Sequence, residues 1–311
     1  MRIKSYFLFL FLLSAIFGQS QQNPLQAMDS DAQMKWVNDT YKGMTLEEKI
    51  GQLFMVLVAS DQDKASTDKI KTLIAEEHLG GIIFSTGGPV RQAKLTNEYQ
   101  ALSKVPLMIG MDAEWGLAMR LDSTFAYPWN MTLGAIKDSN IIEEVGFRIG
   151  SHAKRLGVHF NFAPDVDINI NPRNPIIGNR SFGEDRENVA RKGAAFVRGM
   201  SRAGVLSSGK HFPGHGDTAV DSHKDLPVIP FERERLDSIE MYPYKELIKA
   251  GVSGVMVAHL NVPALEPDEK RPSSLSSSII SGTLKNELGF KGLVLTDALN
   301  MKGVTDFAGD T

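Results

Sequence analysis

The 311-residue sequence contains no cysteine, so it can form neither a disulfide framework nor an N-terminal lipid-bearing cysteine. It also lacks an excess of charge of either sign, since the formal net charge is only -3, and this balance argues against a nucleic-acid-binding surface. The apolar run from Tyr6 to Phe17 has twelve residues, whereas a membrane-spanning helix needs ~20. No GxGxxG motif follows the first predicted strand, which disfavours a dinucleotide-binding fold.

The N-terminal residues have the layout of a secretory signal peptide. Arg2 and Lys4 precede the apolar run, and the small residues Gly18 and Ser20 follow it, where cleavage is expected. We predict a signal peptide at residues 1–20, a lead segment at 21–43 and one domain at 44–311. The mature protein is therefore expected in a periplasm or outside the cell, without stable insertion into a membrane.

The rest of the chain alternates helical patterns with short apolar runs. Thr45 and Glu48 form a capping-box pattern that predicts the start of a helix. Residues 68–80 and 140–157 have apolar side chains at helical spacing and end on glycine. Seven apolar runs read as buried strands, at residues 53–58, 80–85, 106–112, 158–167, 205–212, 254–260 and 292–299. This alternation predicts an α/β fold with a parallel sheet, and seven repeats favour a (β/α)8 TIM-type barrel over a doubly wound sheet.

Five of the predicted strands end in polar residues, and in such a barrel the chemistry lies at these carboxyl ends. A single charged residue often only ends a strand at the solvent, but five ends that meet at one rim predict a site. The residues concerned are Asp112, followed by Glu114, Trp115 and Arg120; Asp165 and Asp167; Lys210 and His211; His259; and Asp297.

The loop "KHFPGHGDTAVDSH", residues 210–223, contains three of the seven histidines, and three kinds of site compete for it. His211 and His215 have the i, i+4 spacing of a helical zinc site, but the intervening proline and glycine oppose a helix and the zincin glutamate is missing. A phosphate-binding loop is disfavoured because no Gly-Lys-Ser/Thr follows. The third interpretation is a carboxylate–imidazole acid/base pair, Asp221 with His223.

The flanking glycines would let this loop move over a bound substrate. The plain alternative is a surface loop that is merely polar. Asp297 follows the last apolar run, in "GLVLTDALNM", and a carboxylate at that position suits nucleophilic attack on an anomeric carbon. Its alternative is an aspartate that only caps the next turn.

Several motifs resemble family 3 glycoside hydrolases, and most closely their single-domain bacterial β-N-acetylglucosaminidases. They are the loop quoted above with "LTDALNM", "MTLEEKIGQLF", "GMDAEWGLAMRL" and "NPIIGNRSFGED", and the resemblance runs from about Met44 to the C-terminus. It implies that Asp297 is the nucleophile of a retaining mechanism and that His223, paired with Asp221, is the general acid/base. The residues that it assigns to N-acetylglucosamine binding are Asp112, Arg120, Arg180, Lys210 and His211.

The resemblance implies a carbohydrate substrate and neither a metal nor another cofactor. The expected reaction removes terminal non-reducing β-N-acetylglucosamine from peptidoglycan-derived or chitin-like oligosaccharides. A β-glucosidase, another family 3 glycosidase or a glycoside phosphorylase is the alternative, and a non-catalytic carbohydrate-binding protein is the alternative of another class. Trp115 stands where the family usually has a second glycine, so it is expected to reshape the sugar subsite. Because Thr311 comes fourteen residues after Asp297, we expect the barrel to be truncated after its seventh strand, in a longer parent chain with a C-terminal domain.

Overall fold

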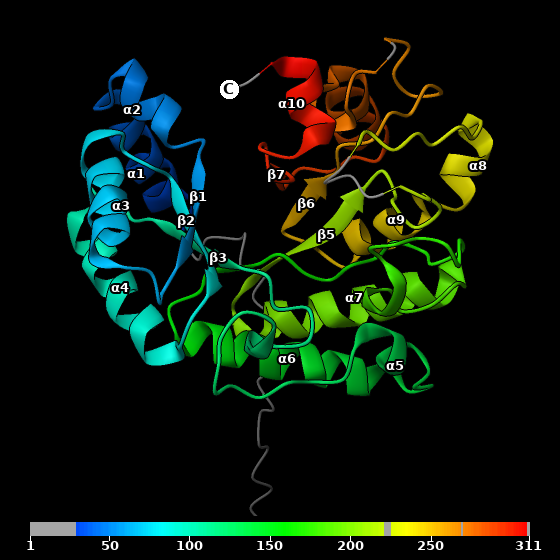
Figure 1. Cartoon of the computed structure of the whole chain (residues 1–311), viewed down its shortest axis with the longest axis horizontal. Helices are drawn as coiled ribbons and strands as arrows, with labels where there is room; N and C mark the ends of the chain where they lie inside the picture. Colours follow the sequence, from blue (N-terminus) through cyan, green and yellow to red (C-terminus); the bar gives the residue numbers. More distant parts are fainter. Residues whose placement is uncertain (1–28, 221–224, 269, 310–311) are drawn as a thin grey trace, which may run out of the picture.

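The protein is described here from a computed structural model, which covers residues 29–220, 225–268 and 270–309. Its centre is a parallel sheet whose seven strands follow one another in chain order, as the seven apolar runs predicted. The sheet curls, with helices outside it (Figure 1). The strands are β1 Met55–Ala59, β2 Gly81–Thr86, β3 Met108–Met111, β4 Phe160–Asn161, β5 Leu206–Phe212, β6 Gly254–Val257 and β7 Leu293–Thr296.

Strand β4 is much shorter than the apolar run at 158–167 suggests. Pro164 interrupts that run, and a proline has no N–H to donate to a neighbouring strand. Pairing with β5 resumes beyond the proline as an isolated bridge between Asp165 and Lys210. The polar residues that follow β4 therefore stay next to those at the end of β5.

The helices cover the outer face of the sheet and the loops between strands (Figure 1). The α-helices are α1 Ser30–Lys42, α2 Leu46–Gly51, α3 Lys64–Glu76, α4 Pro89–Leu102, α5 Asn130–Gly134, α6 Ser139–Arg155, α7 Arg186–Ala203, α8 Arg233–Ser238, α9 Tyr242–Lys249 and α10 Lys302–Ala308. Four shorter or irregular helical segments are η1 Leu117–Met119, η2 Gly178–Arg180, η3 Ser273–Leu275 and η4 Ser278–Glu287.

The predicted helix starts and helical patterns are confirmed. Both bonds of the capping box are present at α2, from Glu48 N to Thr45 Oγ1 and from Thr45 N to the Glu48 carboxylate. The patterns at 68–80 and 140–157 correspond to α3 and α6. Helices α6 and α7 approach closely at Gly199. A Cβ at this position would lie 2.1 Å from the Glu143 carbonyl oxygen, so only glycine fits at that contact.

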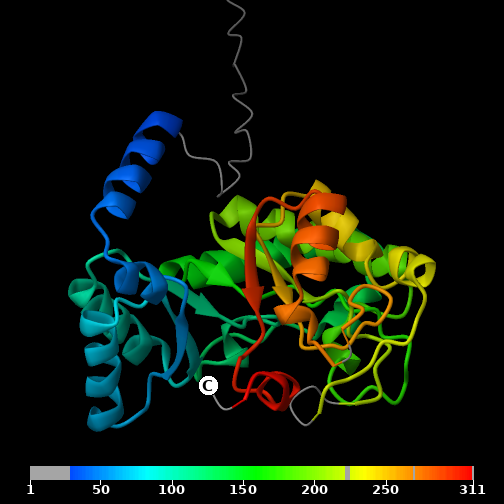
Figure 2. The same ribbon diagram turned by 90° about the horizontal axis from the view of Figure 1, so that it is seen from above.

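Helix α1, Ser30–Lys42, lies in the lead segment, where the sequence predicted no helix. The Asp29 carboxylate caps it by accepting from the backbone N–H groups of Asp31 and Ala32. None of its residues is buried, and it projects from the rest of the molecule (Figure 2). Four large apolar side chains are exposed along it: Met34, Trp36, Val37 and Tyr41.

The hydrophobic core lies on both faces of the central strands. Side chains such as Phe84, Ile109 and Val255 are completely buried, as expected for a parallel sheet covered on both faces. Strands β1 and β7 are the two edges of the sheet, and Leu57 on β1 is 63% exposed. No helix within the described ranges has the length and apolarity that crossing a membrane requires.

Candidate active site

Lys210 lies at the centre of the polar residues that follow the strands. Its side chain is 3% exposed, and Nζ lies 2.8 Å from Asp112 Oδ1 and 2.9 Å from Glu114 Oε1. Arg120 Nη2 donates to the other oxygen of Asp112 at 2.6 Å. Residues that follow β3 and residues of β5 are thus joined by alternating charges, and four predicted site residues meet here.

Arg180 extends this chain of charges from the turn η2. Its guanidinium donates to the Glu114 carboxylate, with 2.8 Å between Nη2 and Oε1 and 3.1 Å between Nε and Oε2. Asn130 Nδ2 donates to the Arg180 carbonyl oxygen at 2.6 Å, which fixes the backbone as well. The arginine is therefore positioned from both sides, although it follows β4 by nineteen residues and no local pattern marked it.

The two acids that follow β3 are ionised. Burial disfavours the charge on Glu114, but the cations of Lys210 and Arg180 outweigh burial and lower the pKa of this carboxyl to about 2. Burial is likewise outweighed at Asp112, where Lys210 and Arg120 lower the pKa below its usual range. Opposite charges within hydrogen-bonding distance stabilise the charged forms of both partners. The site therefore presents fixed carboxylates and cations to a ligand.

Asp167 binds the two histidines of the loop after β5. Its Oδ2 lies 2.7 Å from His211 Nδ1 and accepts from the His211 backbone N–H at 3.2 Å. Its Oδ1 accepts from the His215 backbone N–H at 2.6 Å. On its other side, His211 Nε2 lies 3.3 Å from Arg180 Nη2. Burial, together with the Arg180 charge, lowers the pKa of His211 to about 4, so its imidazole is neutral near pH 7.

Asp165 is completely buried between these groups. Its Oδ1 accepts from the Asp167 N–H at 3.0 Å, whereas its buried Oδ2 receives no hydrogen bond and lies 3.4 Å from Arg180 Nη2. Burial and the neighbouring Asp167 charge raise the pKa of Asp165 to about 7. Asp165 therefore takes up the proton that this pair of acids shares.

Asp165, Asp167 and His211 are also the one group of acids and histidines among the described residues whose ligand atoms are close enough together to hold a metal ion. The Arg180 guanidinium already lies against two of them. The contact between His211 Nδ1 and Asp167 has the length of a charge-assisted hydrogen bond. We therefore assign this group as a hydrogen-bonded network that Arg180 neutralises.

Asp297 directly follows β7 and reaches the same end of the sheet. Its backbone N–H donates to the Val257 carbonyl at 2.9 Å, and its Oδ1 accepts from the Ala298 N–H at 2.8 Å. Burial opposes ionisation, but His211, the Ala298 N–H, His259 and Lys210 together lower the pKa of this carboxyl. Asp297 is thus a half-buried carboxylate beside the cationic residues.

The remaining predicted residues divide into three groups. His259 is buried beside Asp297, with Nε2 3.0 Å from the Ala298 carbonyl oxygen, so it supports the chain around the carboxylate. Trp115 stacks on Trp129, with 4.0 Å between the ring centroids.

Asp221 and His223 lie outside the described residues. Residues 213–220 form no helix, so His211 and His215 do not share a helical face.

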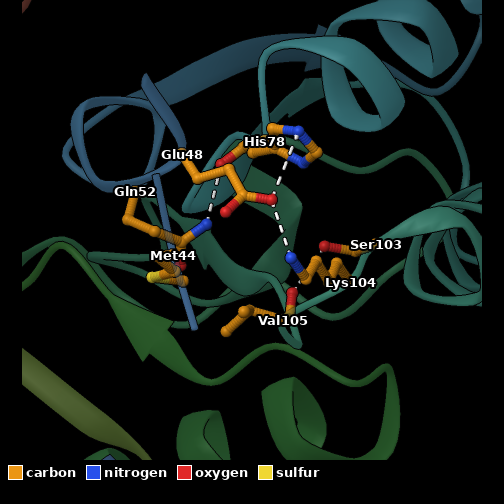
Figure 3. A pocket seen from close by; sticks show the side chains of 7 residues that line it. All are labelled: Met44, Glu48, Gln52, His78, Ser103, Lys104 and Val105. Atoms are coloured by element: carbon orange, nitrogen blue, oxygen red, sulfur yellow. Dashed lines mark hydrogen bonds and ion pairs between the residues drawn. The ribbon is translucent and has the colours of Figure 1, made fainter. Parts of the chain in front are cut away.

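A separate small pocket lies at the opposite end of the sheet, among segments that precede β1, β2 and β3 (Figure 3). Glu48 Oε1 lies 2.7 Å from Lys104 Nζ and 3.7 Å from His78 Nε2, and Gln52 Nε2 donates to the His78 carbonyl. These contacts join helix α2 to the loops before β2 and β3. In barrels of this type, residues at this end usually stabilise the fold rather than bind a ligand.

The curled parallel sheet and the polar site at its carboxyl ends define an enzyme-type α/β barrel domain. Residues 45–311 match the glycosyl hydrolase family 3 N terminal domain, and the chain belongs to that family. It is 38% identical over 262 residues to beta-hexosaminidase A of Pseudoalteromonas piscicida. This match covers 77% of this chain and 44% of the relative.

Two solved structures are similar to the fold. A family 3 beta-N-acetylglucosaminidase from Paenibacillus is 44% identical with a TM-score of 0.80, over 86% of this chain and 52% of that one. A beta-glucoside phosphorylase is 29% identical with a TM-score of 0.85, over 89% and 51%. The chain thus spans about half the length of these relatives. These similar structures confirm the predicted α/β barrel fold class.

Proposed function

We propose that the protein is an exported, retaining β-N-acetylglucosaminidase that removes terminal non-reducing N-acetylglucosamine from peptidoglycan-derived or chitin-like oligosaccharides. The observation that carries this proposal is the position of the ionised Asp297 beside the Asp112–Lys210–Arg120 cluster. A carboxylate next to fixed donors and acceptors suits attack on a sugar whose hydroxyl groups those residues bind. The hexosaminidases among the relatives support the choice of sugar.

The proposed reaction has two steps with one covalent intermediate. Asp112 accepts hydrogen bonds from sugar hydroxyls, while Arg120, Arg180 and Lys210 donate to hydroxyl or acetamido oxygens. Asp297 attacks the anomeric carbon as His223 protonates the leaving oxygen. His223, oriented by Asp221, then takes a proton from the water that hydrolyses the glycosyl-enzyme.

A phosphorylase is the second candidate, and the similarity to a solved beta-glucoside phosphorylase favours it among the alternatives. An imidazole acid/base repels an incoming anion less than a carboxylate would. Phosphate could then replace water as the acceptor in the second step. The product would be a sugar 1-phosphate instead of the free sugar.

The experiment compares aryl N-acetylglucosaminide, glucoside and xyloside with the full-length protein, with and without inorganic phosphate. We expect kcat/KM to be highest for the N-acetylglucosaminide, and we expect free N-acetylglucosamine as the product at every phosphate concentration. Asp297→Ala serves as the inactive control. A preference for the glucoside, or formation of a sugar 1-phosphate, would replace this proposal by the corresponding alternative. Ligand binding without turnover would indicate a carbohydrate-binding protein.

A further inference from the structure

We infer that Asp167 is a positioning residue that fixes His211 as the neutral tautomer with its proton on Nδ1, and that His211 in turn orients Arg180. The contacts run in one line, with 2.7 Å between Asp167 Oδ2 and His211 Nδ1 and 3.3 Å between His211 Nε2 and Arg180 Nη2. The inference rests on the proposed function, because it assigns Arg180 to the sugar-binding site. It gives a role to a buried acid to which the sequence assigned none.

The proton positions follow from what each group can do. A guanidinium only donates hydrogen bonds, so the His211 nitrogen that faces Arg180 must be an acceptor. A neutral imidazole has one acceptor and one donor nitrogen, which leaves the proton on Nδ1, opposite the Asp167 carboxylate. The opposite tautomer would place two N–H donors 3.3 Å apart and would leave Asp167 without this donor.

Asp167 is suited to this role because it can only accept. Its two oxygens receive the His211 imidazole and the backbone N–H groups of His211 and His215. All three partners are donors, so an amide at this position would direct its NH2 group against one of them. The side chain is 1% exposed, so water cannot take over the missing bond. Only an ionised carboxylate satisfies the geometry.

Arg180 is the group that gains from this arrangement. The guanidinium is held by Glu114 on one side and by the His211 lone pair on another. With His211 in the wrong tautomer, the arginine would be repelled from this position while it remained attached to Glu114. The guanidinium N–H groups that the proposed function assigns to the sugar would then shift, and small displacements of positioning groups have large effects on rate.

The direct test is ¹⁵N NMR of the full-length protein with labelled histidine, assigned with a His211→Gln variant. We expect a protonated Nδ1 and an unprotonated Nε2 at His211 in the wild type. In Asp167→Asn the proton should move to Nε2. A protonated Nε2 in the wild type would overturn the inference, and so would stoichiometric zinc bound through His211 Nδ1. This measurement needs no turnover, so its outcome is distinct from that of the proposed function.

The kinetic test uses the same variant. Loss of the hydrogen-bond partner that orients a metal-bound histidine typically costs 10–100-fold. By analogy with that orienting role, we expect Asp167→Asn to lower kcat/KM for the N-acetylglucosaminide by about 30-fold. In an Arg180→Gln background the same change should cost less than about threefold, because coupled residues are not additive. Full additivity of the two changes would contradict a relay through Arg180.

Asp217→Asn is the matched control. Asp217 lies in the loop after β5, and its carboxylate pairs with Arg235 at 2.9 Å rather than with His211. We expect its kcat/KM to stay within about twofold of wild type, as for residues that do not touch the site. If Asp167→Asn does not fold, the wild-type NMR result alone decides the inference.

Discussion

Lys210 and Asp112 are 98 positions apart in the chain, yet Lys210 Nζ lies 2.8 Å from Asp112 Oδ1. The same ammonium neutralises Glu114, which is completely enclosed. Asp112 follows β3 and Lys210 belongs to β5, and these two strands are separated in the sheet by β4. The pair therefore spans the carboxyl end of β4 and joins the ends of β3 and β5 by a largely buried ion pair.

This ion pair predicts a large loss of stability when its cation is removed. Lys210→Met leaves Asp112 and Glu114 with only their arginine partners, and loss of one member of a buried ion pair costs about 3–5 kcal/mol. Adding Glu114→Gln should recover part of the loss. Urea unfolding measures both, and Lys104→Met, in the more exposed pair with Glu48, should cost about 1 kcal/mol or less. Equal losses of unfolding free energy in the two lysine variants would contradict the conclusion that Lys210 forms a stabilising buried ion pair.

Asp297 is expected to form the covalent intermediate. Asp297→Ala should lower kcat by about a thousandfold or more, because loss of a nucleophile removes the whole two-step route. Added azide should restore part of the activity on an activated aryl glycoside and yield a glycosyl azide of inverted configuration. Product analysis by NMR checks the configuration. Residual activity with retained configuration and no azide product would point to another nucleophile.

His223 is expected to protonate the leaving group. His223→Ala should slow substrates with basic leaving oxygens by about 10²–10⁴-fold and activated aryl glycosides far less, because general acid catalysis matters only when the leaving group needs a proton. Asp221→Asn should have a smaller effect of the same kind. Rates across a series of aryl leaving groups measure this dependence. A loss that is uniform across the series would indicate a structural role.

Asp165 predicts a specific dependence of stability on pH. In the unfolded chain its carboxyl ionises near pH 4, whereas in the folded protein its pKa is raised to about 7. Between these values the folded state binds more protons, so this group's contribution to stability falls as pH rises, by up to about 1.4 kcal/mol per pH unit. Asp165→Asn cannot ionise and should gain stability relative to wild type between about pH 4 and pH 7.

Urea unfolding at several pH values measures this difference. The wild-type curve also contains every other titrating group, so the quantity of interest is the gap between the two proteins. A gap that widens up to about pH 7 and then stays constant is the expected outcome. Parallel curves would mean that Asp165 is already ionised in the folded protein.

The sequence was sufficient to predict the order of the strands and the end of the sheet that carries the site. Buried parallel strands are continuous apolar runs, and the polar residues that follow them necessarily gather at one edge. Asp112, Lys210 and Asp297 could be grouped on that ground alone. The local pattern also predicted helix α2, because a capping box depends on residues three apart.

Other features depend on contacts that no local pattern encodes. Arg180 lies on a turn far from any strand end, and only the resemblance to the family selected it. Glu114, Asp165 and Asp167 were recognised as strand-end acids, but their partners come from other loops. Helix α1 was not predicted, although Met34, Val37 and Tyr41 recur at helical spacing; none of its residues is buried, so its apolar side chains do not pack into the core. The acid/base pair Asp221–His223 stays a prediction.

The alternating side chains around Lys210 also determine the electrical balance of the mouth of the sheet. Among the described site residues, three cations, Lys210, Arg120 and Arg180, face two sets of acids. Asp112, Glu114 and Asp297 have lowered pKa values, whereas the pKa values of Asp165 and Asp167 are raised, so this pair shares one proton and carries one negative charge. One negative charge is left over in a largely buried setting, where it acts strongly. A sugar that develops positive character at its anomeric carbon is stabilised there. If the proposed sugar site is occupied as we propose, we expect a sugar that carries a carboxylate, such as a uronic acid, to bind less tightly, because the same charge repels it.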